Sequence, residues 1–213
     1  MKYPFALFLL IVFCLNCSPQ NKVHEADDDL YKQWKVGDYR LPGVYTETES
    51  NGVVIQNSYP KGDRYPDSNG NLFMIAVFWT RVINLTAKPL ELDVRFTGDS
   101  LDIPALPGSY MKLFLPKDTL TRNKLAQYGY GLTDFRLSLD ARLNNPTSLK
   151  KNLKPNEELF FYVAAHGGIR SGFPQKDYVL RTALTIKERD LFYNVYSGRD
   201  SVSYPCGNIS FSD

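Results

Sequence analysis

The sequence has little of the chemistry that metal sites and nucleophilic catalysis require. Its 213 residues include three cysteines and two histidines. A zinc site usually takes about three or four Cys and His ligands, so we expect no zinc site. Residues 67–71 (Asp-Ser-Asn-Gly-Asn) place oxygen-bearing side chains at alternate positions, but an EF-hand calcium loop needs its glycine later and a glutamate at its end. We therefore expect a turn there, and neither a metal nor a cofactor.

An excess of charge of one sign is also lacking. The chain has 25 Lys and Arg against 23 Asp and Glu, a formal net charge of +2. Nucleic-acid binding needs a basic face, and so does electrostatic binding to an anionic membrane surface. We expect no nucleic acid as a partner. The one basic cluster, Lys150, Lys151 and Lys154, is interpreted as a solvated loop.

No hydrophobic run is long enough to span a membrane, although one stands at the N-terminus. A single lysine, Lys2, precedes the apolar run of residues 5–13, which ends at Cys14-Leu15-Asn16-Cys17. The run is shorter than the roughly 20 apolar residues that a spanning helix needs. A basic start, a short apolar middle and a polar stop predict a secretory signal peptide over residues 1–16.

The cysteine at the end of this segment resembles the lipobox of bacterial lipoproteins, including those of the Bacteroidota. The resemblance implies lipid on Cys17 and a protein anchored to the bacterial outer membrane, facing the periplasm or the cell surface. An ordinary signal peptide and a retained anchor are the alternatives. Residues 17–38 then form the lipidated cysteine and a polar tether, and residues 39–213 form a single domain.

Short apolar runs alternate with turn residues along this domain, a pattern typical of all-β proteins. Asn51-Gly52 predicts a hairpin turn, residues 60–70 a loop, and residues 72–83 a central strand buried on both faces. The other predicted strands cover residues 44–46, 53–55, 90–96, 111–115, 159–165, 178–186, 191–196 and 209–211. Cys206 is interpreted as a small buried residue at the start of the last predicted strand, the alternatives being a reactive thiol or an intermolecular disulfide.

One part of the domain is predicted to be helical. Thr121 is a helix cap and Gly129 a helix stop for residues 119–128. Residues 133–143 alternate as a strand does, yet they also carry a helical apolar stripe, and helix is favoured. The predicted fold is an antiparallel β-sandwich with a short helical insertion near residues 119–143.

Residues 82–92 resemble the strand–turn–strand of bacterial immunoglobulin-like domains, and the chain resembles uncharacterised lipoproteins of the Bacteroidota. The first resemblance implies an immunoglobulin-like sandwich, and neither implies an activity. Two predicted loops, residues 59–66 and 166–174, combine aromatic residues with arginine, as interface hot spots do. The candidate binding residues are Arg64, Tyr65, His166, Arg170 and Phe173.

We therefore expect a non-enzymatic binding or assembly module of the cell envelope, with an envelope protein or a glycan as its partner. Exposed tyrosines or tryptophans in one plane would favour a glycan. The alternative is a carbohydrate-active or other hydrolytic enzyme, since paired carboxylates meet in space and not in sequence. His166-Gly167-Gly168 resembles the oxyanion loop of lipases, but no Gly-x-Ser-x-Gly motif occurs and no histidine follows His166.

Overall fold

The computed structural model describes residues 41, 43–66, 72–103, 108–133, 146–168, 180–197 and 200–212. Residues 1–38, with Cys17, the predicted signal peptide and the predicted tether, lie outside these ranges. The chain divides into two units, Met1–Pro42 and Gly43–Asp213, and the second is treated by itself below. Across the described ranges, no helix has the length and apolar character needed to cross a bilayer.

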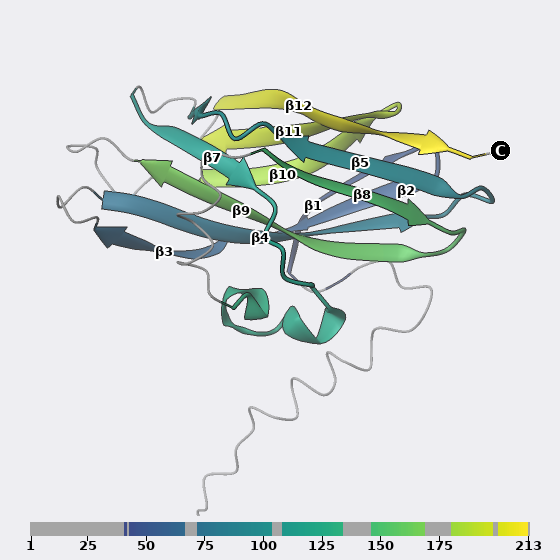
Figure 1. Ribbon diagram of the computed structural model, residues 1–213, viewed down its shortest axis with the longest axis horizontal. Coiled ribbons are helices and arrows are strands. Elements are labelled where there is room, and N and C mark those ends of the chain that lie inside the picture. Colours follow the sequence, from purple (N-terminus) through teal and green to yellow (C-terminus); the bar gives the residue numbers. More distant parts are fainter. Residues whose placement is uncertain are drawn as a thin grey trace, which may run out of the picture. The chain divides into compact units, whose positions relative to one another are not determined.

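The described part of the second unit is built from two antiparallel sheets (Figure 1). The first has the order β1-β2-β4-β9-β7-β6, with β3 also paired to β4, and the second has the order β10-β11-β12-β5-β8. The strands of the first sheet are β1 Val44–Ser50, β2 Val53–Ser58, β3 Lys61–Pro66, β4 Leu72–Asn84, β6 Leu101–Asp102, β7 Tyr110–Phe114 and β9 Glu158–Gly168. Those of the second are β5 Leu90–Phe96, β8 Thr147–Leu153, β10 Leu180–Lys187, β11 Asp190–Ser197 and β12 Asp200–Phe211.

The turn between β1 and β2 confirms the predicted hairpin. Asn51 and Gly52 have positive φ angles of 51° and 76°, and Ser50 pairs with Val53 across the turn. Two consecutive residues with positive φ are the signature of the type I′ turn, whose twist matches that of paired strands. The Asn-Gly pair therefore sets the register of the first two strands.

β4 confirms the predicted central strand. It pairs with β2 and β3 on one side and with β9 on the other. Phe78 and Val82 belong to a hydrophobic core cluster that also contains Leu92 of β5 and Tyr193 of β11, so the two sheets share one core. The alternate residues Ile75, Val77 and Trp79 are buried as well, on the other face of the strand.

The predicted helix over residues 119–128 is wrong. The structure has two short 3₁₀ turns instead, η1 Arg122–Lys124 and η2 Tyr128–Gly131. Thr121 makes no capping bond to the backbone, and Gly129 and Tyr130 have positive φ angles that an α-helix does not allow. The turns lie against the face of the first sheet that is turned away from the second sheet (Figure 1). Residues 134–143, the rest of the predicted insertion, lie outside the described ranges.

Two strands occupy segments that the sequence assigned to loops. β3 covers residues from the predicted loop at 60–70 and pairs with β4, and β8 contains Lys150 and Lys151 and pairs with β5. β8 is an edge strand, where lysines are common because they discourage further pairing. Its Leu153 is buried in the core, while Lys150 is exposed and forms an ion pair with Glu91 at 2.8 Å.

Cys206 is a buried core residue, as predicted. Its residue exposure is 5%, and it is the extra residue of a β-bulge, since Leu191 pairs with Gly207 whereas Phe192 pairs with Pro205. Burial raises the pKa of the thiol to about 12. Because the thiolate is the reactive form of cysteine, the folded protein holds this thiol in an inert state.

Candidate functional site

A cleft of about 1000 Å³ lies between β8 of the second sheet and the first half of β9 of the first sheet. Three segments line it: residues 115–122, which follow β7; residues 146–149 with Lys151, which lie in and just before β8; and residues 158–162, which form the first half of β9. Leu149, Leu159 and Phe160 give its wall a partly exposed apolar character. Below, it is called the edge cleft.

The edge cleft exists because β7 covers only half of β9. Their pairing runs from Tyr110–Gly168 to Phe114–Ala164 and then stops. Pro116 lies just beyond it and has no N–H to continue a ladder. Within the described ranges, residues 158–163 of β9 have a paired strand on the β4 side alone, and β8 pairs with β5 alone. Two strand edges that are unpaired among the described residues therefore border the same cleft.

A network of charged side chains builds one wall of the edge cleft. The carboxylate of Glu158 accepts a hydrogen bond from Nε of Arg81 at 2.7 Å and another from Nη2 of Arg122 at 2.6 Å. The Arg81 side chain is only 5% exposed. Burial lowers the pKa of Arg81, and the charge of Glu158 opposes that shift. Glu158 thus compensates a buried cation and a half-buried one at the same time.

Phe160 and Gln56 complete this network. The Cζ atoms of Arg81 and Arg122 each lie 5.6 Å from the centroid of the Phe160 ring, within the range of a cation–π contact. Nη1 of Arg81 donates to Oε1 of Gln56 at 3.0 Å, and Nε2 of Gln56 donates to Oε2 of Glu47 at 2.6 Å. The network therefore ties the segment after β7 to β9, β4 and β2.

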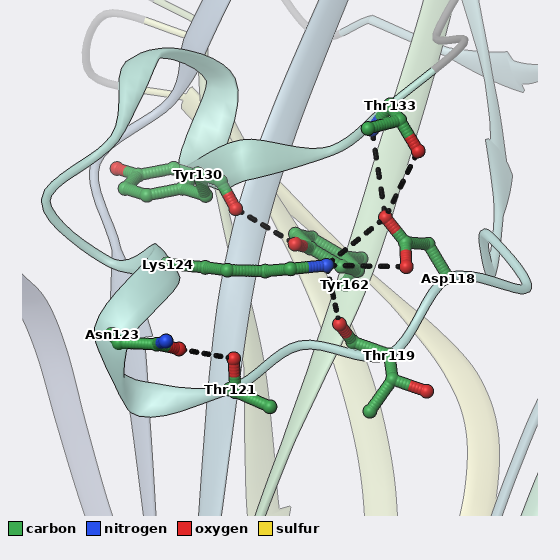
Figure 2. Close-up of polar contacts among 8 residues, drawn as sticks. All are labelled: Asp118, Thr119, Thr121, Asn123, Lys124, Tyr130, Thr133 and Tyr162. Carbon is green, nitrogen blue, oxygen red and sulfur yellow. Dashed lines mark hydrogen bonds and ion pairs between the residues drawn. The ribbon is translucent and has the colours of Figure 1, made fainter.

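Lys124 binds the segment that follows β7 through contacts with Asp118 and Thr119, as Figure 2 shows. Nζ of Lys124 lies 3.2 Å and 3.3 Å from the carboxylate oxygens of Asp118 and donates to the carbonyl of Thr119 at 2.8 Å. The hydroxyl of Tyr162 donates to the carbonyl of Tyr130 at 2.7 Å. Residues 118–130 are thus bound both to themselves and to β9, which makes this wall of the cleft a fixed one.

These contacts shift the titration of two groups at the wall. Burial raises the pKa of Asp118, but its hydrogen bonds with Lys124 and the backbone outweigh burial, so the carboxyl titrates below its usual value. Burial, aided by the charge of Asp118, raises the pKa of Tyr162 to about 12. Asp118 is therefore ionised and Tyr162 neutral at ordinary pH.

The charges left over at the edge cleft are positive. Its two acidic residues, Asp118 and Glu158, are both paired with cations. The exposed Lys117 and Lys151 also line the cleft, and neither forms an ion pair with a described acidic residue. The cleft therefore combines an apolar floor, open strand edges and a positive rim. The described residues contain no group of three or more His, Cys, Asp and Glu placed to hold a metal ion.

The residues predicted from sequence lie elsewhere. Arg64 and Tyr65 belong to β3, opposite Met74 and Phe73 of β4, and only their backbone is described. Arg170 and Phe173 lie outside the described ranges. His166 is not at a strand end: β9 runs through Gly168, and His166 is 5% exposed and stacks on Phe73 with ring centroids 4.9 Å apart.

The backbone around His166 also differs from the oxyanion loop that the sequence resembles. Gly167 and Gly168 pair with β4 on one side and with β7 on the other. A loop that stabilises an oxyanion needs backbone N–H groups directed at the substrate, whereas these residues continue a central strand. The lipase-like motif is therefore part of the sheet.

Sequence reasoning missed the residues of the edge cleft. No local pattern marks Glu158, because its partners Arg81 and Arg122 lie 77 and 36 positions away in the chain. Comparison of the chain with models of known protein families and with curated proteins gives no match. The geometry of the described residues is therefore the basis for the functional proposal.

Proposed function

We propose that the chain is a lipid-anchored protein of the bacterial cell envelope whose immunoglobulin-like β-sandwich binds a partner protein without catalysing a reaction. The observation that carries the proposal is the edge cleft. Two antiparallel sheets that share one core support the sandwich, and the signal-like segment that ends at Cys17 supports the anchor.

The shape of the edge cleft fits an extended segment of the partner. An added strand forms main-chain hydrogen bonds with an open sheet edge, and its alternate side chains enter apolar pockets. β8 and the first half of β9 supply two such edges. Leu149 and Leu159, which are partly buried against the core, supply apolar surface between them.

The charge of the edge cleft defines the segment further. Lys117 and Lys151 lie at the cleft without an acidic partner among the described residues, while Asp118 and Glu158 are already paired. Charge complementarity across an interface promotes association and selects among partners. The bound segment therefore alternates apolar residues with others and carries acidic residues that face Lys117 and Lys151.

Site-specific photo-crosslinking in cells tests this proposal. A photoreactive amino acid at Ser148, an exposed position that lines the edge cleft, is expected to capture one partner protein. The same probe at Lys187, exposed on the opposite edge strand of the same sheet, is the matched control. Capture at Ser148 is expected to fall by roughly tenfold in a Lys117→Glu, Lys151→Glu variant, because like charges now oppose the acidic segment.

Three outcomes would contradict the proposal. The first is equal capture from both positions, which indicates collision and not binding. The second is capture that the charge reversal leaves unchanged. The third is crosslinking from Ser148 to residues 134–145 of the same chain with no partner captured, which would mean that the chain itself covers the cleft.

The anchor is tested separately by metabolic labelling with a fatty-acid analogue. We expect the label on the wild-type protein and on a Cys206→Ser variant, and its complete loss from a Cys17→Ser variant, which should also leave the membrane fraction. Label that persists in Cys17→Ser would place the lipid elsewhere. Protease treatment of intact cells then distinguishes the periplasmic from the surface-facing orientation.

A further inference from the structure

Four side chains gather where β1 and β2 of the first sheet meet β10 and β11 of the second. They are Tyr45 in β1, Tyr59 just after β2, Arg181 in β10 and Tyr196 in β11. We call them the tyrosine–arginine cluster. None of them lines the edge cleft, so the cluster is a separate feature of the surface.

The guanidinium of Arg181 lies over the junction of two tyrosine rings. Its Cζ is 4.9 Å from the centroid of the Tyr45 ring and 4.7 Å from that of the Tyr59 ring, and the two centroids are 5.2 Å apart. Both distances lie within the range of a cation–π contact. The two rings thus hold the guanidinium at a defined place on the surface.

The donors of the cluster have no acceptor among the described residues. The guanidinium of Arg181 forms neither a hydrogen bond nor an ion pair with a described residue, although Arg181 is half-buried. The hydroxyls of Tyr45 and Tyr59 likewise make no hydrogen bond to a described residue. Burial raises the pKa of Tyr45, and the charge of Arg181 opposes that rise, so the hydroxyl lies within electrostatic reach of the guanidinium.

We propose that the tyrosine–arginine cluster binds the carboxylate of an acidic sugar. The planar fork of an arginine matches a carboxylate and binds it through two parallel hydrogen bonds. The hydroxyls of Tyr45 and Tyr59 then bind sugar hydroxyls, and the Tyr59 ring, 46% exposed, contacts the C–H face of the sugar.

The same geometry argues against a neutral sugar. The ring of Tyr45 is tilted by 54° to that of Tyr59 and by 79° to that of Tyr196. The three rings therefore do not form the flat platform on which a neutral sugar chain would stack. The charge of Arg181, and not ring stacking, selects the ligand.

Calorimetric titration of the purified full-length protein with an oligomer of galacturonic acid tests this assignment. We expect saturable binding of the acid and none of its methyl ester, which has the same sugar rings without the charge. Arg181→Gln is expected to weaken binding of the acid by roughly tenfold or more, because a hydrogen bond to a charged group is lost. Arg181→Lys keeps the charge but loses the two parallel N–H donors, so its affinity for the acid should lie between that of the wild type and that of Arg181→Gln.

Arg189→Gln is the matched control, since Arg189 also lies over an aromatic ring, 5.8 Å from the centroid of Phe211, yet outside the cluster. It should bind like the wild type. Equal binding of acid and ester, binding that Arg181→Gln leaves intact, or the absence of any binding overturns the proposal. Binding of a glutamate-rich peptide but not of the sugar acid, with the same dependence on Arg181, also overturns it and assigns the cluster to a peptide.

Discussion

Replacing Asn57 with alanine is expected to destabilise the protein by about 3–5 kcal/mol. Asn57 is 2% exposed and reaches from β2 of the first sheet to β10 of the second. Its Nδ2 donates to the carbonyl of Leu184 at 2.9 Å, and its Oδ1 accepts from the N–H of Leu184 at 3.0 Å. The side-chain amide thus pairs with an edge residue as a further strand would. Alanine leaves both backbone groups of the buried Leu184 without a partner.

Two further bonds increase the expected loss. Asn57 also donates to Oγ1 of Thr46 at 3.1 Å and accepts from Oγ1 of Thr80 at 3.0 Å. Each buried polar group left without a partner costs about 1–3 kcal/mol, a large share of the roughly 5–15 kcal/mol that stabilises a typical domain.

Urea denaturation and amide hydrogen exchange test this prediction together. The midpoint of unfolding should fall strongly for Asn57→Ala, and exchange of the Leu184 amide should accelerate more than exchange within the central strand β4. Asn208→Ala, at an exposed position in β12, should stay within about 0.5 kcal/mol of the wild type. If both variants unfold at the same urea concentration, the hydrogen bonds of Asn57 between the two sheets do not stabilise the protein.

The second large effect is expected for Glu158→Ala, with a loss of about 3 kcal/mol of stability. Removing one partner of a buried ion pair leaves an uncompensated charge, which costs more than the pair itself contributes. Here the remaining charge is Arg81, whose side chain is 5% exposed. Arg122 loses the same partner, but at 35% exposure it gains water instead.

Glu91→Ala is the matched control, because Glu91 forms an exposed ion pair with Lys150 and such pairs contribute only about 0–1 kcal/mol. Glu158→Gln keeps a hydrogen-bond acceptor and removes the charge, so its loss of stability should lie between those of Glu158→Ala and Glu91→Ala. Chemical denaturation gives all three values. A Glu158→Ala loss no larger than that of Glu91→Ala would show that water solvates Arg81 in the variant.

The strands that could be predicted from the sequence are those whose pattern of apolar residues indicates which faces are buried. The continuous apolar run of β4 indicates a strand that is buried on both faces. The alternation of apolar and polar residues in β5 indicates a strand with one apolar face. β3 was missed because it carries lysine, glycine and proline, and β8 because it carries two adjacent lysines. Their extended form is imposed by pairing with β4 and β5. The helix predicted at residues 119–128 was also wrong because tertiary contacts outweigh the local pattern. Tyr130, just after this segment, is buried instead of continuing a helix.

The candidate sites were harder to predict than the strands. His166 was assigned to a loop because two glycines follow it, but pairing with strands on both sides keeps that segment extended. The edge cleft depends on where β7 leaves β9, and the tyrosine–arginine cluster joins residues from strands far apart in the chain. No pattern within one segment encodes either arrangement.

The position of β12 in the second sheet has a consequence for how the chain folds. β12 lies between β11 and β5, so it joins two strand pairs, β10–β11 and β5–β8, that do not pair with each other. Without Asp200–Phe211, β11 and β5 each keep an unpaired edge and the second sheet is divided. Contacts between such distant segments form slowly. Because β12 can close the second sheet only after β10–β11 and β5–β8 have formed, we expect its docking to be a late and slow step of folding.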